Sequence, residues 1–131
     1  MMPQLSSALV KRLLAEARAA HPFEACGILL GKHGEISEVR SCINVHPEPA
    51  RHFEIDPQAL IDAHRAARCG GPDLVGYYHS HPSGPPEPSA TDRASGTGDG
   101  RVWAIVGEGS VGWWRDTRDG FVPLSYAPRG G

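Results

Sequence analysis

Two histidines separated by one residue, His79 and His81, are the first sign of chemistry in this sequence. They close a largely apolar stretch, residues 74–80, whose length and composition are typical of a strand. Because alternate side chains of a strand point to the same face, the two imidazoles are expected to lie side by side. Pro82 ends the strand directly after them, so the pair is expected at an open end of a sheet.

Asp92 is the candidate third ligand, and two histidines with one carboxylate suit zinc. Three protein ligands leave a fourth coordination position for water, which distinguishes a catalytic zinc site from a structural one. The pKa of such a water falls to near 7, but a nearby base must still take its proton. Glu24 is the candidate base, although residue type alone does not choose it over Glu54, Glu87 or Glu108.

The connection from the strand to Asp92 must carry this residue back over the strand end. Residues 82–88 are rich in proline and glycine and are therefore expected to form a loop. Ser89 and Asp92 have the spacing of a capping box, so a short helix is expected to open at Ser89. A helix start and a metal ligand are compatible, because the cap would fix the orientation of Asp92.

The remaining pattern predicts an α/β or α+β domain over residues 1–131, with a mixed sheet and helices packed against it. Serine or aspartate caps followed by apolar residues at helical spacing indicate the helices, and short apolar runs bounded by glycine or proline indicate the strands. The expected helices are 7–20, 57–69 and the one at Ser89, and the expected strands are 25–31, 35–44, 51–55, 74–80, 102–106, 111–115 and 121–126.

Composition excludes several classes of protein. The net charge of −2 over 131 residues leaves no basic field for nucleic acid. No apolar segment reaches the ~20 residues that span a bilayer, so no membrane association is expected. Three cysteines, an odd number, lack a C-x-x-C spacing and follow no secretory signal. These features predict a cytoplasmic protein.

Together, Glu24, the run His79-Ser80-His81-Pro82, and Ser89 with Asp92 resemble the signature of the JAMM zinc metallopeptidases. This family is also called MPN+ or Mov34/PAD-1, and includes JAB1-type proteins; the spacing here departs nowhere from its signature. Segment 21–31 is similar to the opening of short bacterial members, and segments 53–57 and 75–78 add to the resemblance. The resemblance implies an MPN/JAB domain, a curved mixed sheet flanked by helices and similar to the cytidine deaminases.

The resemblance also implies a role for each signature residue. His79, His81 and Asp92 would bind one zinc ion per chain, and Glu24 would hold and deprotonate the attacking water. Ser89 would hydrogen-bond the oxyanion of the tetrahedral intermediate. Members of the family cleave peptide or isopeptide bonds, typically just after the C-terminal glycine of ubiquitin or a ubiquitin-like protein, and MPN domains often form homodimers.

The short loops of this sequence limit the range of expected substrates. Eukaryotic members carry two insertions that grip ubiquitin, whereas residues 44–51 form a short loop here and about eight residues separate Asp92 from the strand near Arg101. A small sulfur-carrier protein of the ThiS or MoaD type, with a C-terminal Gly-Gly tail, is therefore an alternative to ubiquitin. A general peptidase and a role associated with DNA repair stay open.

Two other functions compete with a peptidase. One is a non-catalytic MPN scaffold, like the family members that lack the metal ligands, although every ligand is present here. The other is a zinc deaminase, but its H-x-E and P-C-x-x-C patterns are absent from this sequence.

Three further features are interpreted structurally. Cys26 lies in an apolar run and is expected to be a small buried side chain, with a redox-sensitive thiol as the alternative. The neighbours Trp113 and Trp114 are expected to face opposite sides of their strand. The end Gly130-Gly131 looks like a ubiquitin-like tail but is interpreted as a coincidental glycine-rich terminus.

Overall fold

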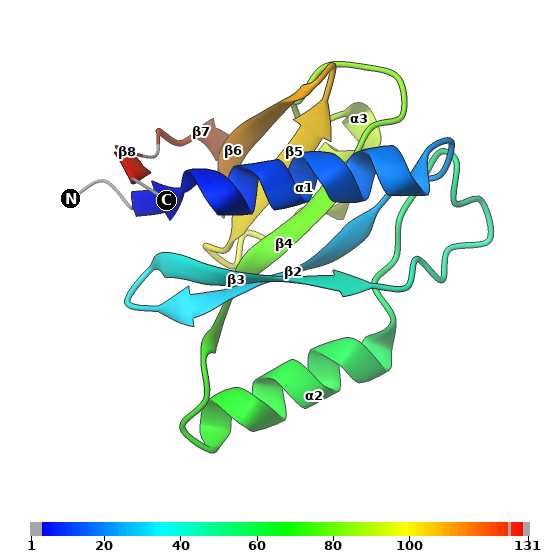
Figure 1. Cartoon of the computed structure of the whole chain (residues 1–131). Helices are drawn as coiled ribbons and strands as arrows, with labels where there is room; N and C mark the ends of the chain where they lie inside the picture. The colour runs from blue at the N-terminus through cyan, green and yellow to red at the C-terminus, as the bar shows by residue number, and fades with distance from the viewer. Residues whose placement is uncertain (1–3, 126, 130–131) are drawn as a thin grey trace.

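A six-stranded mixed sheet forms the centre of the molecule (Figure 1). The computed structural model describes residues 4–125 and 127–129. The strand order is β3-β2-β4-β5-β6-β7; β4 and β5 are parallel, and every other neighbouring pair is antiparallel. The strands are β2 (Cys26–Lys32), β3 (Glu35–Cys42), β4 (Asp73–Ser80), β5 (Val102–Gly107), β6 (Ser110–Thr117) and β7 (Gly120–Pro123). This is the α+β architecture that the sequence predicts.

Two helices lie on opposite sides of the sheet, as Figure 1 shows: α1 (Ser7–Ala20) and α2 (Pro57–Arg68). Leu29 and its sheet neighbours pack in one apolar cluster with Leu13 of α1. Ile28, the preceding residue, packs in a second cluster with Ala63 of α2. Since β2 is covered on both faces, almost all of its residues are apolar and buried.

Each helix begins where a polar side chain caps it. The Ser6 hydroxyl accepts the Ala8 N–H at the start of α1, at 3.1 Å. Asp56 accepts the Gln58 N–H at the start of α2, where Pro57 occupies the first helical position. Among the described residues, none of the helices is long and apolar enough to cross a membrane.

The connection from β4 to β5 builds the functional end of the sheet. Because the two strands are parallel, the chain must travel back along the sheet between them. It does so through the loop at residues 81–89 and the short helix α3 (Ala90–Ser95), which Figure 1 places near one end of the sheet. The carboxyl end of β4, which carries the histidines, therefore faces this connection.

One predicted strand, residues 51–55, does not form. Only Ile55 makes an isolated bridge, with Asn44. The Glu48 carbonyl accepts the N–H groups of Arg51 and His52 and bends the chain into a turn at that point. The side chain of Asn44 then accepts the Glu54 N–H and donates to the His52 carbonyl. The Glu54 carbonyl accepts the Val45 N–H, so backbone pairing is limited to a single bridge beside Asn44.

Smaller differences concern the ends of the elements. The strand predicted over 35–44 ends at Cys42, and the strand predicted over 121–126 is β7, which ends at Pro123. Short strands β1 (Gln4–Ser6) and β8 (Ala127–Arg129) pair in parallel as a second sheet that the sequence did not predict. Gly130-Gly131 lies outside the described residues.

Candidate metal centre

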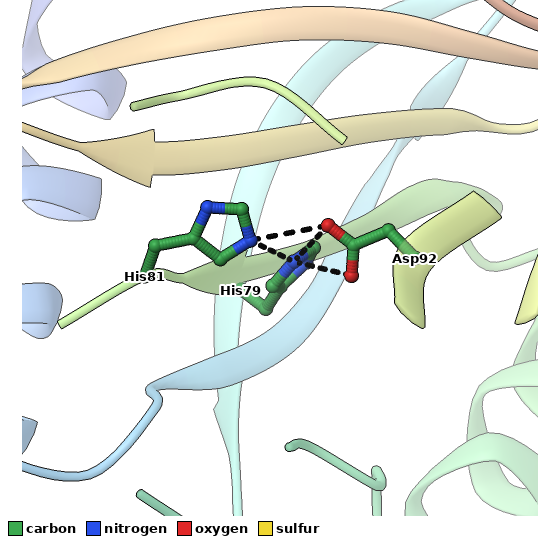
Figure 2. Close-up of side chains that lie close together, drawn as sticks. All are labelled: His79, His81 and Asp92. Carbon is green, nitrogen blue, oxygen red and sulfur yellow. Dashed lines mark hydrogen bonds and ion pairs between the residues drawn. The ribbon is translucent and has the colours of Figure 1, made fainter. Parts of the chain in front are cut away.

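His79 and His81 lie side by side at the carboxyl end of β4, as the period of the strand predicts. His79 is fully buried within the strand, and His81 is the first residue after it. The His81 backbone N–H donates to the Val106 carbonyl at 2.8 Å, which continues the pairing with β5 by one residue. The two Nε2 atoms are 3.2 Å apart (Figure 2).

Asp92 reaches the two imidazoles from the first turn of α3 (Figure 2). Its Oδ2 lies 3.1 Å from the Nε2 of His79 and 3.1 Å from the Nε2 of His81. A complete capping box holds it there: the Ser89 hydroxyl accepts the Asp92 N–H at 3.0 Å, and the Ser89 N–H donates to Oδ2 at 2.9 Å. The cap and the ligand site thus use the same carboxylate.

The three side chains fit a zinc ion. A tetrahedral site with bonds of 2.0–2.1 Å places its ligand atoms about 3.3 Å apart, close to the separations of 3.1–3.2 Å found here. Burial lowers the pKa of His79, which favours the neutral imidazole that a metal requires. For Asp92, burial favours the neutral acid, but hydrogen bonds with the two histidines outweigh it and hold the pKa below its usual range. His79, His81 and Asp92 therefore form a metal-binding triad.

Neighbouring groups orient both rings. The Nδ1–H of His81 donates to the Pro85 carbonyl at 2.9 Å, so the lone pair of this imidazole lies on Nε2, toward the centre of the triad. The ring of His79 stacks on Phe53 with centroids 4.2 Å apart, and meets the edge of Trp103 at 5.7 Å. Sequence patterns did not identify these aromatic neighbours or the carbonyl of Pro85.

Glu24 lies two residues before the start of β2 and is only 7% exposed. Its N–H donates to the Pro49 carbonyl at 2.7 Å, and its own carbonyl accepts a hydrogen bond from Asn44 at 3.2 Å. Burial raises the pKa of its carboxyl to about 7, against the opposing attraction of His81. A pKa close to the working pH is what an efficient general base needs.

One cleft of about 490 Å³ connects these groups. Glu24, His81, Ser89 and Asp92 all line it, while the segments 46–53 and 82–88 contribute its other walls. Of the three rival glutamates, Glu54 and Glu108 do not line the cleft, and Glu87 lines it but is exposed to solvent. The structure therefore brings together the five residues that the sequence singled out, and favours Glu24 over its rivals.

Comparison with known proteins identifies the class. The family profile described as prokaryotic homologs of the JAB domain matches residues 6–118. The chain belongs to this family and is a JAMM-type metallopeptidase of the isopeptidase kind.

Three named proteins are similar to this chain. A desampylase of Haloferax volcanii is 37% identical over an alignment of 113 residues that covers 81% of this chain and 78% of the relative. A probable TtuB-protein conjugate cleaving protease of Thermus thermophilus is 40% identical over 63% of this chain and 59% of its own. A CysO-cysteine peptidase of Mycobacterium tuberculosis is 34% identical over 64% of this chain and 58% of its own.

Solved structures share the fold. The solution structure of protein DSY2949 from Desulfitobacterium hafniense superposes with a TM-score of 0.84 at 27% identity, covering 99% of this chain and 94% of that one. The JAB1/MPN domain protein AF2198 from Archaeoglobus fulgidus gives a TM-score of 0.60 at 23% identity, over 95% and 96% of the two chains. The expected MPN/JAB fold is thereby confirmed.

Proposed function

We propose that this chain is a zinc-dependent isopeptidase that hydrolyses the amide bond after the glycine-ended tail of a ubiquitin-like or sulfur-carrier protein. The observation that carries the proposal is the convergence of three ligand atoms, two of them from residues that line the same cleft as the buried Glu24. The names of two relatives support the substrate class, because one is called a probable TtuB-protein conjugate cleaving protease and the other a CysO-cysteine peptidase.

Each residue of the cleft has a defined task in this proposal. His79, His81 and Asp92 hold the zinc ion, which acts as a Lewis acid and lowers the pKa of water. Glu24 takes a proton from the attacking water and delivers it to the leaving amine. Ser89 accepts the Asp92 N–H through its oxygen, so its hydroxyl proton remains available to the developing oxyanion.

The likeness to enzymes that act on conjugates guides the choice of partner. We propose a small partner with a C-terminal Gly-Gly tail, a homodimeric enzyme, and a reducing compartment such as the cytoplasm. The last of these is supported by Cys26, Cys42 and Cys69, all of which are free thiols.

The test is to incubate zinc-loaded protein with a panel of glycine-ended ubiquitin-like fusions and to detect cleavage by intact mass. We expect hydrolysis directly after the terminal glycine. The variant Glu24→Gln should retain zinc and lose activity by about 10²-fold or more, because no base remains to take the proton.

Three outcomes would contradict the proposal, each in a different part. Full activity of correctly folded, metal-free protein would exclude the zinc mechanism. A fully zinc-loaded protein that cleaves no member of the panel would favour the non-catalytic scaffold. Equal cleavage of several unrelated tails would contradict a single dedicated partner, while leaving the chemistry intact.

A further inference from the structure

The loop that forms one wall of the cleft lies directly on two glycines of the sheet. A Cβ atom on Gly107, the last residue of β5, would lie 2.8 Å from the Pro85 carbonyl oxygen. A Cβ atom on Gly112 of β6 would overlap the Pro86 carbonyl oxygen. Only glycine lets the loop backbone approach this closely, so Gly107 and Gly112 form a shelf on which the loop lies.

Trp114 fastens the loop to that shelf. Its indole N–H donates to the Pro86 carbonyl at 3.1 Å, across 28 positions of sequence. Because side chains of β6 alternate between faces, Trp114 and Gly112 share one face, and the neighbouring Trp113 packs against the apolar cluster beneath α1 on the other. The side chain of Trp114 is half-buried and stands beside the loop rather than in the core.

The fastened segment contains the group that orients a metal ligand. Pro85 precedes Pro86, and its carbonyl accepts the Nδ1–H of His81 at 2.9 Å. A shift of the 85–86 backbone would therefore release His81 from the ring orientation that directs Nε2 toward His79 and Asp92. Backbone carbonyls of a loop have no fixed position unless other groups hold them, and here Trp114 and the shelf do so.

We propose that Trp114 is a positioning residue for the metal centre, acting through Pro86 and the Pro85 carbonyl on the tautomer and orientation of His81. The inference rests on the proposed zinc site and adds a residue that is not part of the JAMM signature. Trp114 does not line the cleft, so its effect on the site is indirect.

The experiment compares zinc affinity in three variants, by competition with a chelator of known affinity. Trp114→Phe keeps a flat apolar ring but removes the indole N–H. Gly107→Ala keeps Trp114 and displaces the Pro85 carbonyl. Trp113→Phe is the matched control, because it truncates the same residue type on the opposite face of the same strand.

We expect zinc affinity to fall about tenfold in Trp114→Phe and between ten- and a hundredfold in Gly107→Ala, the range typical of groups that orient metal ligands. Trp113→Phe should lower the melting temperature of the metal-free protein without weakening zinc binding. Ring ¹⁵N shifts provide a second readout: the Nδ1–H tautomer of His81 should lose population in the first two variants and keep it in the control.

The inference is overturned if Trp114→Phe binds zinc within twofold of the wild type and keeps the tautomer. If Trp114→Phe fails to fold, Gly107→Ala tests the step from the loop to His81, and unchanged zinc binding and tautomer in that variant overturn the inference. A wild-type protein that binds no zinc would instead refute the proposed function, so the two failures are distinguishable.

Discussion

At the scale of single residues, burial determines what Glu24 can do. Its carboxyl is buried at the cleft, and the pKa of about 7 lies well above the ordinary 4.5. Between these values the folded state binds more protons than the unfolded state, so this group lowers stability as pH rises. A residue kept for its basicity is thus expected to cost stability at neutral pH.

That cost can be measured with metal-free protein. From about pH 4.5 to pH 8, the free energy of unfolding of Glu24→Gln should rise relative to wild type, because glutamine does not titrate. The rise in the pKa of the Glu24 carboxyl from 4.5 to about 7 corresponds to a gain in the free energy of unfolding on the order of 2–3 kcal/mol. Urea unfolding of both proteins with chelator present measures the difference; a difference that stays constant with pH would contradict it.

Cys26 shows the opposite consequence of burial. It is 2% exposed, and burial raises the pKa of its thiol to about 12, whereas Cys69 is exposed. Since the thiolate is the reactive form, we expect iodoacetamide near pH 8 to modify Cys69 and leave Cys26 intact until urea is added. Peptide mapping distinguishes the two sites. Equal labelling in the folded protein would restore the redox interpretation of Cys26.

At the scale of elements, the start of α3 combines a helix cap and a proposed catalytic role in Ser89. Ser89→Ala removes the acceptor of the Asp92 N–H, which should cost about 1 kcal/mol of stability. It also removes the proposed oxyanion donor, so kcat should fall by about 10²–10³. Urea unfolding and steady-state kinetics measure the two effects separately.

Ser89→Thr is the matched control, because it retains the hydroxyl. It should keep most of both properties. In Ser89→Ala, the backbone N–H of residue 89 still reaches Asp92 Oδ2, so zinc affinity should change far less than kcat. A variant that loses stability but keeps kcat would reduce Ser89 to a helix cap.

Elements with a local signature were predictable from the sequence. The period of β4 placed His79 and His81 on one face, and the S-x-x-D spacing gave the capping box that directs Asp92. The sequence also predicts a strand over 51–55, yet this segment forms only one bridge, and the Asn44 side chain bonds the Glu54 N–H and the His52 carbonyl. No local sequence pattern indicates such bonds from a distant side chain.

The groups that support the site could not be predicted from the sequence, for a related reason. The Pro85 carbonyl that orients His81 is a backbone group, and every residue has one, so the residue type does not indicate this hydrogen bond. Trp114 was expected only to face the side opposite Trp113; its bond to Pro86 depends on how the loop crosses β6. Spacing along the chain can identify ligands, whereas the groups that hold them come together only in the folded molecule.

At the scale of the whole molecule, the short connections around the cleft limit how much of a partner protein can contact the enzyme. Residues 46–53 and 82–88 line a cleft of about 490 Å³. A cleft of this size can hold a few extended residues of a substrate but not a folded domain. We therefore expect recognition to be concentrated in the partner's glycine-ended tail, with little contribution from the body of the partner.

Grafting that tail onto an unrelated folded domain tests this expectation. For a fusion that the enzyme cleaves, moving its last six residues to the new domain should change kcat/KM by less than about tenfold, or 1.4 kcal/mol of transition-state stabilisation. The control carries leucine in place of the terminal glycine and should resist cleavage, because a branched side chain would disturb the bond held beside Glu24. A loss of a thousandfold with the intact tail would show that the body of the partner also docks on the enzyme, on a surface outside the cleft.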